Sequence, residues 1–136
     1  ETCGHYPTEV LDQACRVLDA LIFDIKCLDS ARHKKATGVG SELILKNIGH
    51  VFEHFPELPV LIRTPVIPGF NDTEEDILGI REMIPRKANI RYEALTYHRM
   101  GQPKYGYLGR RYELEGVKAD EAFMNRLNIM LKSYEK

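Results

Sequence analysis

The chain has 136 residues, of which 43% are hydrophobic and 29% are charged. This length suits one domain with one hydrophobic core, so residues 1–136 are taken as a single domain. Its 19 basic and 20 acidic residues leave a net charge of −1, which argues against nucleic acid or an anionic membrane as a partner. No run reaches the roughly 18 apolar residues of a membrane span. We therefore expect a soluble, cytoplasmic protein.

Hydrophobic periodicity predicts helices that alternate with strands along the chain. Amphipathic patterns predict four helices, over residues 7–18, 41–55, 71–84 and 120–136. Continuous or alternating apolar runs predict three strands, over residues 20–26, 59–67 and 89–98. N-terminal caps are expected at Ser41 and at residues 71–73, and a long loop is expected over residues 99–116.

This alternation is typical of βα units around a parallel sheet, which gives an α/β fold class. Three strands cannot close a barrel. The alternatives are therefore a small open sheet or the second half of a larger (β/α) barrel whose first half is missing.

The three cysteines, Cys3, Cys15 and Cys27, form no C-x-x-C or C-x-x-x-C pair. Neither a zinc finger nor an iron–sulfur ligand run can be read from them. Reduced thiols are the plain interpretation, with Cys15 and Cys27 as packing residues of a helix and a strand.

Charged side chains stand where the predicted strands end, which is where parallel α/β proteins bind their ligands. Asp24 and Lys26 end the first strand on one face, Arg63 stands near the end of the second, and His98 ends the third. Each residue alone has a structural explanation, such as an ion pair between Asp24 and Lys26. Together they suggest a zwitterionic ligand. Lys26 and Arg63 could bind its carboxylate, and Asp24 could bind its ammonium group or a cation. His98 could lie against a flat ring of the ligand.

Four blocks of the chain, "ETCGH", "FDIKCLDSARHKKATGVGSELILKNI", "VLIRTPVIPGFNDTEEDI" and "LTYHRMGQPKYGYLG", resemble the second half of the glycyl-radical-enzyme activating enzymes. These are radical S-adenosylmethionine (SAM) proteins and include pyruvate formate-lyase activating enzyme. The resemblance implies a partial (β/α)6 TIM-like barrel that holds a [4Fe–4S] cluster and SAM. It also implies an oxidoreductase of anaerobic metabolism, in which reduced flavodoxin or ferredoxin supplies an electron. SAM is then cleaved to a radical that removes a hydrogen atom from a glycine of a partner enzyme.

The resemblance assigns roles to individual residues of this chain. Asp24 and Lys26 match a D-x-K motif that contacts the methionyl part of SAM. Arg63 matches a SAM-contacting arginine, Val66 a residue that lines the adenine pocket, and His98 a histidine against the adenine. Two further residues, Glu1 and Thr2, match an acid–threonine pair that joins Asp24 at a monovalent cation, although Glu1 stands where the best-known member has aspartate.

The family's cluster-binding C-x-x-x-C-x-x-C motif is absent from this sequence. We therefore expect no iron–sulfur ligands and no catalytic residue in this chain, and we expect the isolated chain to be inactive. A missing half-barrel also predicts dimerisation through an exposed sheet edge. The glycyl-radical enzyme that serves as partner cannot be read from the residues; the loop over residues 99–109 is a candidate contact.

Two other readings stay open at this point. The first is a Schiff-base lyase of (β/α) architecture, with Lys26 as the amine and Asp24 as its proton partner. The second is an inert half-barrel fragment, which is compatible with an active parent enzyme.

Overall fold

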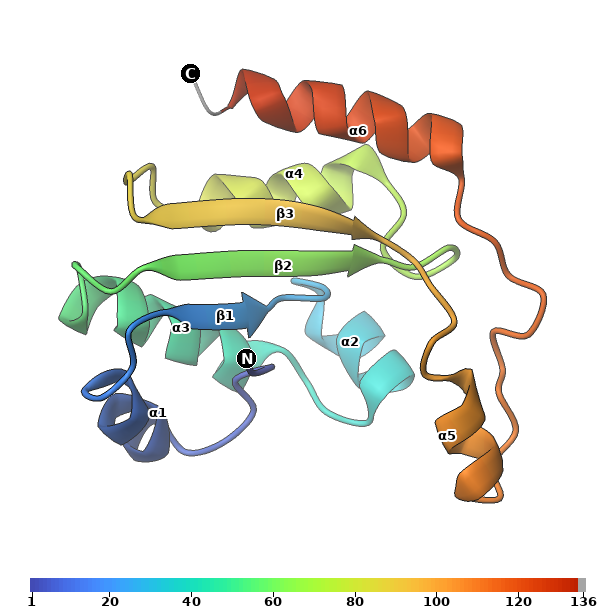
Figure 1. The fold of residues 1–136 in the computed structure, drawn as a ribbon, viewed down its shortest axis with the longest axis horizontal. Helices are drawn as coiled ribbons and strands as arrows, with labels where there is room; N and C mark the ends of the chain where they lie inside the picture. The colour runs from blue at the N-terminus through green and yellow to red at the C-terminus, as the bar shows by residue number, and fades with distance from the viewer. Residues whose placement is uncertain (135–136) are drawn as a thin grey trace.

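The computed structural model describes residues 1–134 and shows three parallel strands flanked by helices (Figure 1). The strands lie in the order β1-β2-β3 and comprise β1 (Leu21–Asp24), β2 (Val60–Val66) and β3 (Ile90–Thr96). The helices are α1 (Thr8–Cys15), α2 (Ser30–Thr37), α3 (Glu42–His54), α4 (Glu74–Met83), α5 (Gln102–Tyr107) and α6 (Glu121–Ser133). Within residues 1–134, every helix is too short or too polar to cross a bilayer.

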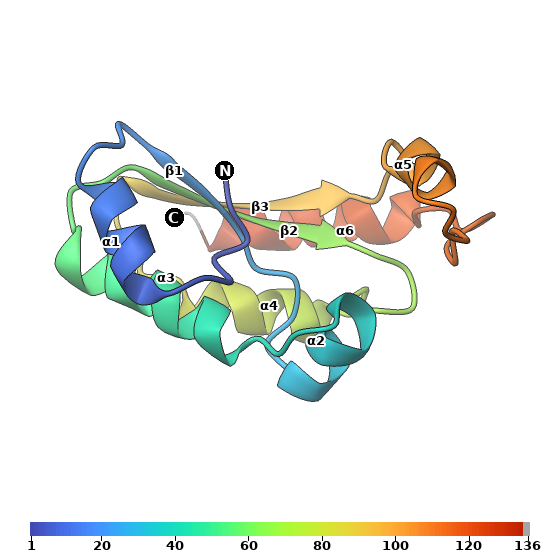
Figure 2. The same ribbon diagram turned by 90° about the horizontal axis from the view of Figure 1, so that it is seen from below.

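One face of the sheet carries the core, because α1, α2, α3 and α4 lie beneath it (Figure 2). Alternate strand residues such as Phe23 and Ile62 point to this face and are completely buried, whereas Asp24 and Arg63 occupy the intervening positions. From α6, Leu127 joins the same core, also without exposed surface. Burying each such side chain contributes about 1.5–3 kcal/mol, so this apolar layer fixes the orientation of the polar residues between.

The predicted α/β class and the three strands are confirmed, and each strand lies within its predicted range. Two short helices, α2 and α5, were not predicted; α5 lies inside the segment expected to be a loop. The first predicted helix ends three residues early, at Cys15. The last predicted helix is observed as α6, and its expected residues 135 and 136 lie outside the described part of the chain.

Two of the predicted capping residues use their side chains for other hydrogen bonds. Ser41 occupies the N-cap position of α3 as predicted, but its hydroxyl donates to the carbonyl of Leu28 at 2.9 Å and forms no capping hydrogen bond. Asn71 is fully buried and bonds to strand ends, whereas Thr73 does cap α4 by accepting from the Asp76 amide. Cys15 and Cys27 are buried as predicted, and Cys3 is exposed.

The N-terminal segment lies along the outer edge of β1. The Thr2 amide donates to the carbonyl of Ile22, and the Asp24 amide donates to the carbonyl of Thr2, both at 2.9 Å. The buried Asn47 of α3 anchors this segment by donating to the carbonyls of Gly4 and Tyr6. This part of the edge is therefore paired within the chain, while dimerisation stays a prediction that light scattering can check.

Tyr92 of β3 gives a testable alkaline transition. Its hydroxyl is buried without a hydrogen-bond partner among residues 1–134, and this burial raises the pKa of Tyr92 to about 12. In the unfolded chain the Tyr92 hydroxyl ionises at a lower pH, near pH 10. The contribution of Tyr92 to the free energy of unfolding is therefore complete below pH 10 and is lost as the pH rises towards 12. Urea unfolding should show a smaller loss of stability over this window in Tyr92→Phe than in the unmodified chain. Equal losses would contradict this assignment.

Candidate functional site

A cluster of four charged side chains lies on the face of the sheet that the helices leave open. Asp24 and Arg63 are register partners on β1 and β2, and the Arg63 Nε and Nη2 atoms donate to Asp24 Oδ1 at 3.2 and 3.1 Å. The other Asp24 oxygen pairs with Lys26 Nζ at 3.4 Å, and Arg63 also pairs with Glu1. We call Glu1, Asp24, Lys26 and Arg63 the charged cluster.

Alternation along the chain explains how the cluster forms. Ile25, between Asp24 and Lys26, is 1% exposed and packs in the core, so its two neighbours project together to the opposite face. The exposed fractions of the Arg63, Asp24 and Lys26 side chains are 19%, 20% and 27%, which leaves the charges half-buried and reachable. Arg63 is the fourth of seven β2 residues, and is therefore nearer the middle of its strand than predicted.

The charged cluster pairs two cations, Arg63 and Lys26, with two acids, Asp24 and Glu1. Burial alone would lower the pKa of the Arg63 guanidinium, but its hydrogen bonds to Glu1 and Asp24 raise this pKa above the ordinary value. Arg63 therefore stays charged throughout the pH range in which the protein folds. The arrangement can accept a zwitterion, because a ligand carboxylate can meet Arg63 and Lys26 while a ligand ammonium group meets Asp24.

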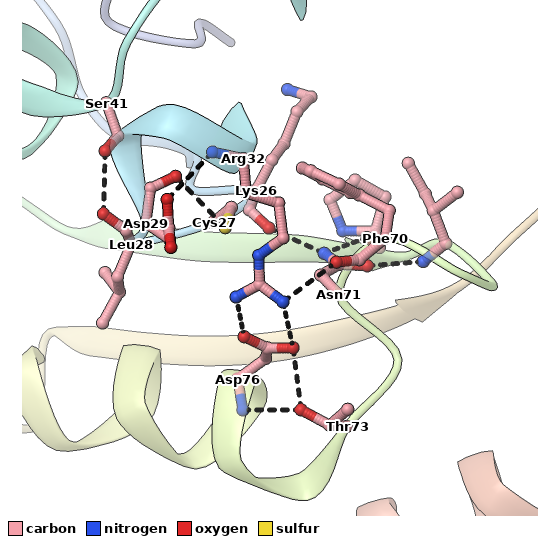
Figure 3. A network of polar contacts seen from close by, with 12 residues as sticks. Lys26, Cys27, Leu28, Asp29, Arg32, Ser41, Phe70, Asn71, Thr73 and Asp76 are labelled. Atoms are coloured by element: carbon pink, nitrogen blue, oxygen red, sulfur yellow. Dashed lines mark hydrogen bonds and ion pairs between the residues drawn. The ribbon is translucent and has the colours of Figure 1, made fainter. Parts of the chain in front are cut away.

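A buried asparagine holds the two strand ends of the site together (Figure 3). The Asn71 amide nitrogen donates to the carbonyls of Lys26 and Pro65 at 2.7 and 2.9 Å, and its oxygen accepts from the Ile67 amide at 2.7 Å. Asn71 thus forms hydrogen bonds with three backbone groups: the carbonyl of Lys26 after β1, the carbonyl of Pro65 in β2, and the amide of Ile67 in the turn that follows β2. The backbone of Lys26 is fixed by this side chain.

An ion pair beyond Asn71 joins α2 to α4 (Figure 3). Arg32 Nη1 donates to Asp76 Oδ2 at 3.0 Å and to the carbonyl of Phe70 at 3.2 Å, and its other terminal nitrogen also pairs with Asp76. The hydrogen bond to Asp76 raises the pKa of Arg32. Neither this pair nor the bridging role of Asn71 was predicted, because the partners are 44 and 45 residues apart in sequence.

The structure does not bring every predicted site residue into the charged cluster. Val66 is 3% exposed and lies beside Phe123 and Met124 of α6, on the face opposite Arg63. His98 is exposed, two residues past the end of β3, and its Nδ1 accepts from the Met100 amide at 3.4 Å. Thr2 lies on the β1 edge, where its hydroxyl accepts from the Gly4 amide at 3.0 Å.

The chemistry of the cysteines does not fit an iron–sulfur cluster. Cys3 is exposed in the N-terminal segment, whereas Cys15 and Cys27 are buried in α1 and after β1. Over residues 1–134 there is no group of three or more His, Cys, Asp or Glu side chains that could hold a metal ion.

The chain is therefore a domain of the α/β class, with charged residues where β1 ends, which is the end of the strands at which parallel α/β proteins bind their ligands. Its sequence is 98% identical over 136 residues to the (2S)-3-sulfopropanediol sulfolyase activating enzyme of Bilophila wadsworthia, covering all of this chain and 45% of that protein. It is 43% identical over 131 residues to the isethionate sulfite-lyase activating enzyme of Nitratidesulfovibrio vulgaris, covering 96% of the chain and 42% of that protein. No protein-family model matches.

A solved structure shares the fold. It is a domain of a pyruvate-formate lyase-activating enzyme from Bacteroides vulgatus, with a TM-score of 0.68 and 26% identity, covering 94% of this chain and 70% of that one. The resemblance to the glycyl-radical-enzyme activating enzymes is thereby confirmed, and the chain corresponds to part of such an enzyme. It spans less than half the length of the relatives matched by sequence. These relatives favour an activating enzyme over the Schiff-base lyase.

Proposed function

We propose that this chain is the SAM-binding, C-terminal portion of a radical SAM activating enzyme, and that its sheet is the second half of a partial (β/α)6 barrel. The charged cluster is the observation that carries this proposal. It offers Arg63 and Lys26 to the carboxylate of SAM and Asp24 to the ammonium group, on the open face that the inside of a barrel requires. When bound, SAM supplies the 5′-deoxyadenosyl radical of the parent enzyme.

The chain's own residues would bind and orient the ligand. Asn71 and the Arg32–Asp76 pair hold the backbone after β1, so that Lys26 is presented from a fixed position. His98 and the Val66 segment are proposed to meet the adenine; for Val66 this contact would come from the backbone, since its side chain faces α6. A monovalent cation at Glu1, Thr2 and Asp24 belongs to the proposal and would compete with Arg63 for the two carboxylates.

The [4Fe–4S] cluster is assigned to the rest of the parent enzyme. The isolated chain is therefore expected to be inactive, because its described residues include no group of His, Cys, Asp or Glu side chains that could hold the cluster through which the electron reaches SAM. Anaerobic incubation of the chain with iron and sulfide should give no stable cluster absorption and no 5′-deoxyadenosine. A stable [4Fe–4S] spectrum accompanied by SAM cleavage would contradict this assignment.

For the parent enzyme we propose a glycyl-radical enzyme as protein substrate and reduced flavodoxin or ferredoxin as electron donor. Identity of 98% to a (2S)-3-sulfopropanediol sulfolyase activating enzyme favours a sulfolyase of that substrate over a pyruvate formate-lyase. The parent, given SAM and reduced flavodoxin, should produce a glycyl radical on the sulfolyase that is detectable by electron paramagnetic resonance. A radical formed only on pyruvate formate-lyase would reverse the choice of partner.

A further inference from the structure

Helix α5 and the residues on either side of it expose an apolar surface. Met100, Tyr107 and Leu108 are 80%, 87% and 68% exposed, and Tyr105 is 41% exposed. We call these four residues the α5 patch. Single exposed apolar side chains are common on proteins, but here several are concentrated in one short segment. Such a concentration is typical of a surface that another molecule covers.

The α5 patch lies at the ligand end of the sheet. The chain leaves β3 at Thr96, passes His98 and reaches α5. In both ribbon views α5 lies beyond the carboxyl ends of the strands, on the open side of the sheet (Figure 1, Figure 2). Parallel α/β proteins bind their ligands at this end of the strands. The patch therefore lies beside the mouth of the site proposed for SAM.

Tyrosine contacts hold α5 in this position. The hydroxyls of Tyr97, directly after β3, and Tyr112, after α5, share a hydrogen bond. The ring of Tyr105 packs edge-on against that of Tyr112, with the ring centres 5.0 Å apart. The Arg110 amide donates to the carbonyl of Tyr105 at 2.8 Å, which closes the turn after α5. Because these contacts tie α5 to the end of β3, binding to the patch costs less conformational entropy than binding to an unanchored loop.

Positive charge flanks the α5 patch. Four exposed cations stand in or beside α5, and residues 99–112 contain no acid; the cations are Arg99, Lys104, Arg110 and Arg111. Among residues 1–134, no carboxylate forms a salt bridge with any of them. The net charge of the whole chain is −1, so this segment is a local positive region. The surface therefore fits an apolar loop with acidic flanks.

We infer that the α5 patch docks the glycine-bearing loop of the glycyl-radical enzyme, an inference that rests on the proposed function. A radical formed from SAM removes a hydrogen atom only from a group that it touches, so this loop must enter at the ligand end, where the patch lies. Upstream residues of the parent extend the sheet beside β1, as the pairing of Thr2 with Phe23 indicates. Because α5 lies beyond the strand ends and not beside the sheet, its position favours the protein substrate over the rest of the parent as occupant.

Glycyl-radical formation by the parent enzyme, measured by electron paramagnetic resonance at increasing sulfolyase concentration, tests the inference. Tyr107→Ser combined with Leu108→Ser should raise the KM for the sulfolyase at least about tenfold and retain the rate at saturation, because apolar contact area is lost. The matched control, Val17→Ser combined with Ile129→Ser, removes comparably exposed apolar side chains away from α5. Its KM should stay within about twofold of that of the unmodified parent.

A second pair of variants tests the charged flanks. Lys104→Gln combined with Arg110→Gln should raise the KM for the sulfolyase about threefold or more and make it less sensitive to salt, because two ionic contacts are lost. Lys46→Gln combined with Lys132→Gln makes the same change of net charge on exposed residues of α3 and α6. This control should keep both the KM and the salt sensitivity of the unmodified parent.

SAM cleavage by the dithionite-reduced parent, without sulfolyase, separates this inference from the proposed function. The α5 variants should form 5′-deoxyadenosine at the unmodified rate, because their changes lie outside the charged cluster. An unchanged KM for Tyr107→Ser with Leu108→Ser, or an equal rise in its control, would overturn the inference. Loss of SAM cleavage in that variant would do the same by assigning the patch to contacts within the parent. If the unmodified parent cleaved no SAM, the proposed function itself would fail, and this inference with it.

Discussion

Replacing Asn71 with leucine is expected to lower the free energy of unfolding by about 2–4 kcal/mol. The substitution keeps the branched shape of the side chain, although leucine is larger, and it removes the Asn71 hydrogen bonds to three backbone groups, the carbonyls of Lys26 and Pro65 and the amide of Ile67. Asn71 has no exposed surface, so water cannot take over these hydrogen bonds without opening the structure. Urea unfolding of the chain measures the loss.

Asn89 provides a matched control at the other end of the sheet. Its amide nitrogen also bridges two carbonyls, those of Pro56 and Leu58, but the residue is only half-buried. Asn89→Leu should therefore cost less than Asn71→Leu, because water can replace part of what is lost. If Asn71→Leu unfolded at the same urea concentration as the unmodified chain, the bridge would not stabilise the strand ends as described.

The second large effect is expected on ligand affinity. Arg63→Met in the parent enzyme should weaken SAM binding by about 2–3 kcal/mol, or roughly 30- to 150-fold. The change removes the cation placed to meet the ligand's carboxylate and leaves Asp24 and Glu1 facing that carboxylate. Equilibrium dialysis of labelled SAM against the cluster-loaded parent gives the two dissociation constants.

Arg91→Met is the matched control for this measurement. Arg91 lies on the same face of the sheet, on β3, and its register partner Leu61 precedes Arg63 by two residues, but the structure gives Arg91 no contact with the charged cluster. Its replacement should leave SAM affinity unchanged within about twofold. A loss of affinity equal to that of Arg63→Met would show that general positive charge, and not the position of Arg63, controls binding.

The sequence allowed the framework to be predicted because the strands are long apolar runs whose periodicity is local. The side of the sheet on which Asp24 and Lys26 lie followed from the same alternation, since burial of Ile25 forces its neighbours to the opposite face. Helix α2 was missed because its polar sequence has no apolar stripe: it buries one residue, His33. Its stability comes from Asp29 as N-cap and from the distant pair between Arg32 and Asp76.

The contacts within the site were less predictable because they join residues far apart in the chain. Glu1 reaches Arg63 only because Thr2 pairs with β1, and Asn71 was expected to cap α4 because asparagine is common at that position. The signal that sets Asn71 apart is the Pro68-Gly69 turn before it, with Gly69 at φ +77°, which brings the chain back towards the strand ends.

The most direct test of the SAM site compares SAM with decarboxylated SAM, which lacks the carboxylate but keeps the ammonium, sulfonium and adenosyl groups. The parent enzyme with its cluster should bind SAM much more tightly, and this preference should largely disappear when Arg63 and Lys26 are both replaced by methionine. Equal affinity for the two compounds in the unmodified enzyme would contradict the claim that the charged cluster holds the amino-acid end of SAM.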